Sequence, residues 1–161
     1  YLTTNVTLMN NKLPNILANS IGFNAYRLGL LFKRGLIRTL HKYKLSPEQW
    51  QILVALNESE KSINQSTLAA ITLKDRHSIS RIIRKMETTG WVKRTTDKND
   101  SRANLVKMSV EGKRKFPKVK KSLMDAFTPI DSAVSEGDKA NFINYCGKMS
   151  DTLIKIFPQA D

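Results

Sequence analysis

The sequence has little of what marks several large classes of protein. Its 161 residues include one cysteine, Cys146, which excludes an internal disulfide framework and suits a reducing compartment. It has no apolar run of the roughly 18 residues that a transmembrane helix needs. Its polar N-terminus lacks the basic start and apolar stretch of a signal peptide. We therefore expect a cytoplasmic protein that has no membrane partner.

Residues arranged for catalysis are also scarce. The chain has two histidines, far apart in the sequence, and shows no glycine-rich phosphate loop, no nucleophile elbow and no spacing typical of metal ligands. Its acidic residues form no obvious pair for acid–base chemistry. We predict that the protein is not an enzyme and that it uses no cofactor and no metal.

Acidic residues are few compared with basic ones. The chain holds 27 Lys and Arg against 14 Asp and Glu, which gives a net charge of +13. The excess is concentrated, because residues 74–121 hold 16 basic and 5 acidic side chains. Scattered charge would indicate a well-solvated surface, whereas a cationic segment of this density indicates a polyanionic partner.

The cationic segment contains the pattern of a helix-turn-helix. A short helix is expected over residues 65–71, with Ile71 on its buried face. A second helix is expected over residues 76–89, where isoleucine and methionine recur at intervals of three and four. Asp75 is placed to cap the N-terminus of this second helix, and Gly90 to end it in a left-handed conformation.

Two short β-segments follow the second helix. Residues 91–95 and 105–109 are rich in strand-forming residues, and the charged residues between them are typical of a tight turn. Two helices followed by such a hairpin predict a winged helix-turn-helix over residues 66–112. In that fold the second helix enters the DNA major groove and the hairpin, called the wing, lies beside it.

Further helices are expected on both sides of this module. One spans residues 15–43 and carries an apolar stripe, and another begins after Ser46, which is placed to close a capping box. On the far side, Ser109 caps a helix that begins at residue 111. After Pro129 the character changes, and a last helix with an apolar stripe begins near residue 137.

The apolar stripes of the first and the last helix need a partner surface to cover them, because the DNA-reading module offers no such surface. The expected fold class is mainly α with a small β-wing, a winged helix-turn-helix domain flanked by dimerisation helices. The expected division is an N-terminal arm and dimerisation helix over 1–45, a DNA-binding domain over 46–112, and C-terminal dimerisation helices over 113–161.

The chain resembles the MarR/SlyA family of transcription regulators over residues 20–157. The family's wing signature is matched by Gly90, Trp91-Val92, Arg94, Asp100-Ser101-Arg102, Leu105-Val106, Met108-Ser109 and Gly112. The family's entry to its second helix is similar to Leu45-Ser46-Pro47-Glu48-Gln49-Trp50. The chain departs from the family in having Met-Ser where Leu-Thr is usual. It also lacks the first-helix cysteine of the peroxide-sensing members.

This resemblance implies a homodimer whose terminal helices intertwine across a two-fold axis and which reads a pseudo-palindromic operator. It also implies regulation of a nearby operon, with repression as our expectation. In the family such regulation is often relieved by a small phenolic or other lipophilic effector. Effectors often bind where the first two helices meet, and the residues expected there are His41 and Trp50. A packing role is the alternative for Trp50.

We expect the double-stranded DNA partner to be bound by two groups of residues. The recognition-helix group is His77, Ser78, Ser80, Arg81, Arg84 and Lys85. The wing group is Arg94, Lys98, Asp100 and Arg102. Arg102 is expected in the minor groove, with Asp100 orienting its guanidinium or capping the turn. Arg94, Lys98 and Lys107 would serve phosphates or ion pairs within the wing.

Several alternatives stay open at this point. A non-specific architectural DNA-binding protein could use the same module, and it would bind with a steep salt dependence and little discrimination. The cations of the second helix and of residues 113–121 could be solvated helix faces. Membrane binding by residues 113–121 is disfavoured, because no Trp- or Leu-rich face lies opposite. For Cys146, a buried structural role is expected rather than a redox switch.

Overall fold

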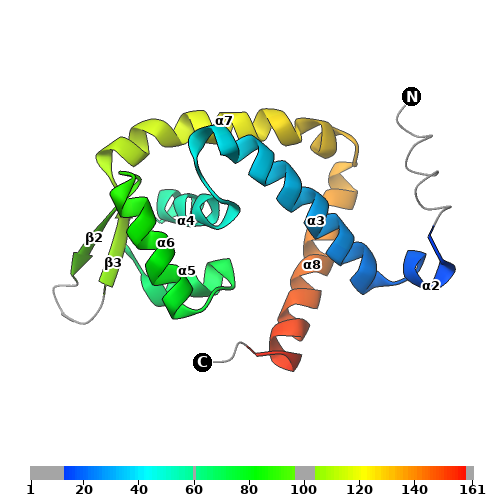
Figure 1. Cartoon of the computed structure of the whole chain (residues 1–161). Helices are drawn as coiled ribbons and strands as arrows, with labels where there is room; N and C mark the ends of the chain where they lie inside the picture. The colour runs from blue at the N-terminus through cyan, green and yellow to red at the C-terminus, as the bar shows by residue number, and fades with distance from the viewer. Residues whose placement is uncertain (1–12, 60, 97–103, 159–161) are drawn as a thin grey trace.

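The computed structural model describes residues 13–59, 61–96 and 104–158. At one end of the molecule, three helices and a small sheet form a compact module, and long helices extend from it toward the other end (Figure 1). Among the described residues no helix is both long and apolar enough to cross a membrane.

The first long helix is preceded by a short one. α2 (Asn15–Ala18) and α3 (Ile21–Leu40) replace the single helix expected over residues 15–43. The helix is interrupted before Ser20. The Ser20 hydroxyl caps α3 by accepting a hydrogen bond from the Phe23 N–H at 3.2 Å. A 3₁₀ turn, η1 (His41–Tyr43), follows α3, and Lys44 ends it with a left-handed φ of 54°.

α4 (Pro47–Glu58) begins with the predicted capping box. The Ser46 hydroxyl accepts a hydrogen bond from the Gln49 N–H at 3.2 Å, and the Gln49 side chain accepts one from the Ser46 N–H at 2.9 Å. Ile52 and Leu53 are then completely buried. The capping box therefore fixes the direction in which α4 enters the core.

The helix-turn-helix consists of α5 (Gln65–Thr72) and α6 (Arg76–Thr88), close to the predicted bounds. The turn between them passes through Leu73, which adopts a left-handed φ of 50°. The expectation that Ile71 is buried is wrong, because its side chain is 45% exposed beside this turn. Thr72 is buried instead, where its hydroxyl donates to the Leu68 carbonyl.

The wing is part of a three-stranded antiparallel sheet. β2 (Val92–Thr96) pairs with β3 (Asn104–Met108), and β3 also pairs with β1 (Ile63–Asn64), in the order β1-β3-β2. Gly90 has the predicted left-handed conformation, with φ of 75°. The sequence did not predict β1, because a strand of two residues has no periodicity to detect.

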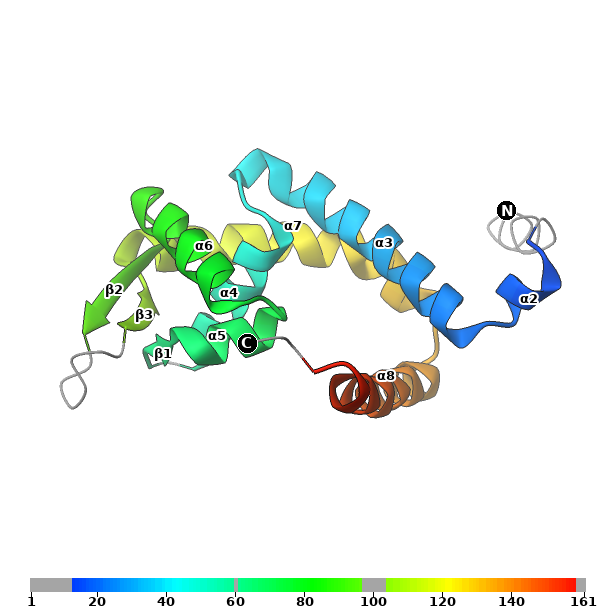
Figure 2. The ribbon, with the colours of Figure 1, turned by 60° about the horizontal axis from the view of Figure 1, so that its bottom comes forward.

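Two long helices complete the chain. α7 (Val110–Ser132) starts at the predicted Ser109 cap and continues through Pro129 to Ser132, so the change expected after Pro129 comes slightly later. α8 (Glu136–Ile156) begins close to residue 137, as expected. α3 and α7 lie side by side in both views, and Phe32 stacks on Phe127 with ring centroids 5.7 Å apart (Figures 1 and 2).

The hydrophobic core lies within the winged module and where that module meets α7. Its fully buried large side chains are Leu40, Ile52, Leu53, Leu68, Ile79, Ile83, Met86, Val106 and Val119. By contrast, α8 contains no buried residue, and its stripe, including Phe142 and Leu153, is exposed in this single chain. The apolar faces of α3 and α8 therefore remain uncovered in the single chain.

Candidate nucleic-acid interface

α6 has two opposite faces. Ile79, Ile83 and Met86 are completely buried against the module. The opposite face presents side chains that the sequence predicted as DNA contacts. His77, Arg81, Arg84 and Lys85 are exposed, whereas Ser78 and Ser80 are half-buried. The packing of the inner face thus holds a row of basic and polar side chains toward solvent on a rigid helix.

The first turn of α6 is fixed by Asp75. One carboxylate oxygen accepts a hydrogen bond from the Ser78 N–H at 2.7 Å, and the other accepts one from the Ser78 hydroxyl at 2.8 Å. The backbone hydrogen bond from Ser78, followed by the one from its hydroxyl, lowers the pKa of Asp75. Ser78 therefore serves the helix cap in this structure, and its remaining hydrogen-bonding capacity is what a DNA partner could use.

Glu87 and Arg94 connect the end of α6 to β2. The Arg94 guanidinium donates from Nε to the Glu87 carboxylate at 2.7 Å and contacts the same carboxylate through a terminal nitrogen at 2.7 Å. The Arg94 N–H donates to the other carboxylate oxygen at 3.2 Å. These bonds, led by the one from the Arg94 side chain, lower the pKa of Glu87.

Arg94 therefore has a partner within the protein. Both side chains are about one-third exposed, at 34% and 33%. Arg94 forms an ion pair, but its partner lies on α6 and not within the wing as the sequence predicted. Glu87, which the sequence reasoning did not single out, joins the recognition helix to the wing. Its partner lies on a different element, so no local pattern indicates the pairing.

The strands of the wing carry two further cations. Lys93 lies directly opposite Lys107 in the β2–β3 register, and both side chains are exposed. Lys93 was not among the DNA contacts predicted from the sequence. Three predicted wing contacts, Lys98, Asp100 and Arg102, lie outside the described residues.

The base of the wing is held against the start of α7. The Ser109 hydroxyl donates to the Gly90 carbonyl at 2.6 Å and accepts from the Gly112 N–H at 2.8 Å. A Cβ atom on Gly112 would lie 2.2 Å from the Trp91 carbonyl oxygen, a separation that no side chain tolerates. These residues belong to the wing signature described in the sequence analysis, and they hold the β2–β3 hairpin close to the start of α7.

A cleft of about 930 Å³ lies beside α6. It is lined by Lys33, Ile37, His41, Lys42, Lys44, Leu45, Ser46, Pro47, Glu48, Gln49, Arg81, Ile82 and Lys85. His41 is thus placed at a cleft, as a ligand-contacting residue would be. Trp50 does not line this cleft. It stacks on Phe116, with ring centroids 5.2 Å apart.

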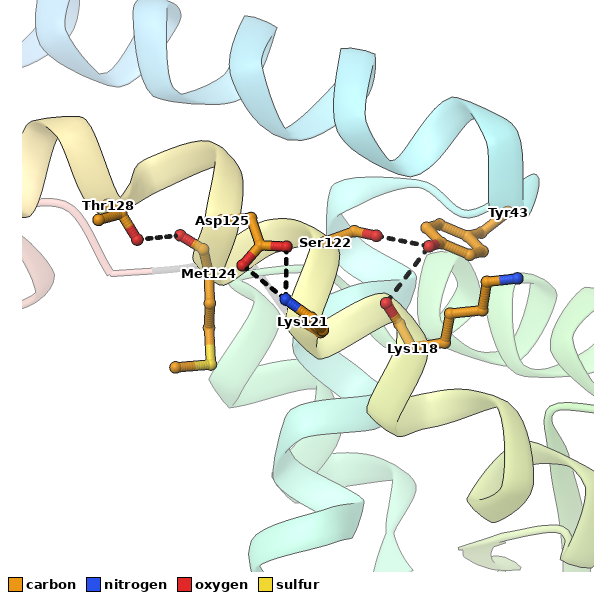
Figure 3. Close-up of polar contacts among 7 residues, drawn as sticks. All are labelled: Tyr43, Lys118, Lys121, Ser122, Met124, Asp125 and Thr128. Atoms are coloured by element: carbon orange, nitrogen blue, oxygen red, sulfur yellow. Dashed lines mark hydrogen bonds and ion pairs between the residues drawn. The ribbon is translucent and has the colours of Figure 1, made fainter.

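The turn that lines the cleft is fastened to α7. The Tyr43 hydroxyl shares a hydrogen bond of 2.6 Å with the Ser122 hydroxyl and donates to the Lys118 carbonyl at 3.3 Å (Figure 3). On the same helix, the Lys121 ammonium contacts both oxygens of Asp125 at 2.9 and 3.1 Å (Figure 3). η1 is therefore anchored to α7, and α6 forms another wall of the cleft that η1 lines.

Part of the cationic series on α7 is already paired. Lys115 and Arg114 both contact Glu111, at 2.7 and 3.5 Å, and Lys115 also lies over the Trp91 ring. Lys113 and Lys120 are exposed, with no ion pair to any described residue. The described residues contain no group of three or more His, Cys, Asp or Glu side chains that could hold a metal ion.

Cys146 is half-buried rather than buried. It lines an apolar cavity of about 510 Å³ between α3 and α8, together with Phe32, Phe142 and Met149. Cys146 lies on the uncovered apolar stripe of α8, so how far its side chain is buried depends on what covers that helix.

The helix-turn-helix, the three-stranded sheet with its wing and the cationic outer face of α6 together define a winged helix-turn-helix protein. A family model described as "MarR family" matches residues 43–103. The chain is 24% identical over 130 residues to the HTH-type transcriptional regulator PecS of Dickeya dadantii, covering 80% of this chain and 78% of the relative. These matches support a MarR-family winged helix regulator.

Solved structures share the fold of this chain. The crystal structure of CouR from Rhodococcus jostii RHA1 bound to p-coumaroyl-CoA is 26% identical, with a TM-score of 0.72, and covers 92% of this chain and 99% of that one. The transcriptional repressor CouR bound to a 23-mer DNA duplex has a TM-score of 0.77 at 17% identity, covering 86% and 99%. At that identity the second match supports the fold alone.

Proposed function

We propose that this protein is a homodimeric repressor that reads a pseudo-palindromic operator through α6 in the major groove. The observation that carries the proposal is the division of α6 into a completely buried apolar face and an exposed face bearing His77, Arg81, Arg84 and Lys85. Arginine pairs in bidentate fashion with guanine, and lysine binds phosphates. The chain shares its fold with a repressor solved on a DNA duplex, so the fold is one that can present such a face to DNA.

The wing would contact the DNA beside α6. Arg102 remains our candidate for the minor groove, with Asp100 orienting it and Lys98 on a phosphate. Arg94 would act through its ion pair with Glu87, which holds the wing at a fixed angle to α6. Ser80 lies at the edge of the reading face, and Ser78 would reach DNA while it remains part of the cap.

The proposed homodimer is supported by the uncovered faces of α3 and α8. Both helices expose large apolar side chains in the single chain, among them Ile21, Leu31, Phe142 and Leu153. Exposed apolar area of this extent indicates an interface. A second copy related by a two-fold axis would present two α6 helices, as a palindromic site requires.

We also propose that an amphipathic anion bound in the cleft beside α6 releases the DNA. Ile37, Leu45 and Ile82 supply apolar surface, and Lys33, Lys42 and Lys44 supply positive charge. Arg81 and Lys85 line the same cleft and belong to the DNA-reading face. An anion that engages these two cations takes them away from the DNA. The similar protein CouR, solved with p-coumaroyl-CoA, makes that molecule a suitable first probe.

The proposal is tested by selecting bound duplexes from a random DNA library near physiological salt. We expect an enriched inverted repeat with half-sites about one helical turn apart. Tight, salt-sensitive binding without any enriched sequence would instead establish an architectural DNA-binding protein. Light scattering on the same sample gives the mass of the particle, and a monomer would contradict the dimeric reading.

A further inference from the structure

A further cavity of the winged module shares no lining residue with the cleft beside α6. It has a volume of about 910 Å³ and is lined by Leu56, Asn57, Lys61, Ser62, Leu105, Lys107, Met108, Lys113, Phe116 and Pro117. These residues come from the end of α4, the segment before β1, the strand β3 and the first turns of α7. None of them belongs to α5 or α6, so occupation of this groove does not use the DNA-reading helix.

The groove combines an apolar floor with a cationic rim. Leu56, Met108 and Phe116 form the buried floor, and Leu105 is half-buried beside them. Exposed Lys61, Lys107 and Lys113 stand around it, and no Asp or Glu occurs among the described lining residues. The charge of the groove is therefore positive and uncompensated within its own walls.

The positions of the lysines leave their positive charges without compensating partners. Lys107 lies directly opposite Lys93 on β2, and like charges in such a pair destabilise a sheet unless an anion is nearby. Lys113 shares the first turns of α7 with Arg114 and Lys115, yet only those two contact Glu111. Among the described residues, Lys61, Lys107 and Lys113 have no ion-pair partner.

We propose that this groove docks a short acidic segment of a protein partner, one in which Asp or Glu residues alternate with large apolar residues. The lysines come from three different elements, so several separate carboxylates complement them better than a single charge does. The apolar floor requires hydrophobic side chains from the partner, which a DNA backbone does not provide. Since the groove and α6 share no residue, α6 stays available to DNA when the partner is bound, although Lys107 also belongs to the wing strand β3.

The test uses the full chain and a fluorescein-labelled peptide in which Glu and Asp alternate with Leu and Phe, measured by fluorescence polarisation. We expect saturable binding that persists when α6 is occupied by DNA. The substitutions Lys107→Glu and Lys113→Glu should weaken peptide binding by about tenfold or more. Lys120→Glu is the matched control, because Lys120 is exposed on the same helix and does not line the groove.

Three results would overturn the proposal. One is the absence of peptide binding, or an equal loss with Lys120→Glu, which would indicate general attraction to a basic protein. Another is equal binding of a peptide with Asn and Gln in place of Asp and Glu. The third is a loss of DNA affinity in Lys107→Glu or Lys113→Glu as large as that in Arg84→Glu, which would assign the groove to the DNA interface. Circular dichroism and thermal melts verify that each variant is folded.

Discussion

At the scale of single residues, the ion pair of Glu87 and Arg94 is the contact with the clearest functional consequence. It joins the last turn of α6 to β2 through two side-chain contacts of 2.7 Å and one backbone hydrogen bond. A partly exposed pair of this kind contributes at most about 1 kcal/mol to stability. Its larger effect should be on the geometry that presents α6 and the wing to one duplex.

We therefore predict that Glu87→Gln and Arg94→Ala each lower DNA affinity several-fold while changing the melting temperature little. The double variant should lose no more than the worse single variant, because both substitutions remove the same contact. Binding titrations of the three variants measure this coupling. Additive losses would mean that Arg94 contacts DNA directly.

The same pair predicts a pH dependence. Arg94 lowers the pKa of Glu87 below its ordinary 4.5, so the folded state prefers the ionised carboxylate. The stability this provides is present above the unfolded-state pKa and is lost as the pH falls through the lowered folded-state pKa. Urea unfolding at a series of acidic pH values should therefore show the wild type and Glu87→Gln converging as the pH falls. A difference that stays constant across the acid range would contradict the ion-pair account.

Gly112 is a second residue whose role is local and testable. Because an added Cβ would lie 2.2 Å from the Trp91 carbonyl oxygen, Gly112→Ala must separate the start of α7 from the wing. We expect a loss of about 2–3 kcal/mol of unfolding free energy, measured in urea. Gly137→Ala is the control, because nothing lies within 4 Å of its Cβ position. Equal effects of the two substitutions would contradict this role for Gly112.

At the scale of secondary structure, α8 has no buried residue within its own chain. We predict that Leu153→Glu, placed on its apolar stripe, converts the dimer to a monomer and weakens DNA binding, since a charge would be buried in the interface. Asn144→Glu adds the same charge to the opposite side of the helix and should leave the dimer intact. Light scattering distinguishes the two outcomes, and a dimeric Leu153→Glu variant would refute the assignment.

The elements that the sequence predicted are those with local signals. The Asp75 cap, the apolar spacing of α6 and the left-handed Gly90 determine where α6 begins and ends, and each can be recognised within a few residues. β1 has no such signal, because its two residues become a strand only by pairing with β3. The break before α3 was missed because it depends on a serine cap rather than on proline or glycine.

The candidate site follows the same rule. The exposed cations of α6 could be predicted, since their positions follow from the helical period and the buried isoleucines. The pairing of Arg94 with Glu87 could not, because it depends on the angle between α6 and β2. The separation of Trp50 from the cleft that His41 lines likewise depends on how α4 packs against α7.

At the scale of the whole molecule, the proposed effector cleft beside α6 would couple ligand binding to DNA release, because Arg81 and Lys85 line it. We predict that p-coumaroyl-CoA, as a probe amphipathic anion, displaces the selected duplex from the wild-type protein. The double substitution Lys42→Gln and Lys44→Gln should raise the required concentration without changing DNA affinity, because neither residue belongs to α6. Displacement that is unchanged by this double variant would place the ligand elsewhere.

We assign the reading of DNA sequence to the exposed face of α6, and one titration separates this role from non-specific binding. Wild-type protein, an Arg81→Ala and Arg84→Ala double variant, and Lys120→Ala as control are titrated against the selected duplex and a scrambled duplex. We expect the double variant to lose about 1–3 kcal/mol of binding free energy per arginine on the selected duplex and much less on the scrambled one, so that discrimination between the two duplexes is lost. Discrimination that survives the loss of both arginines would contradict this assignment.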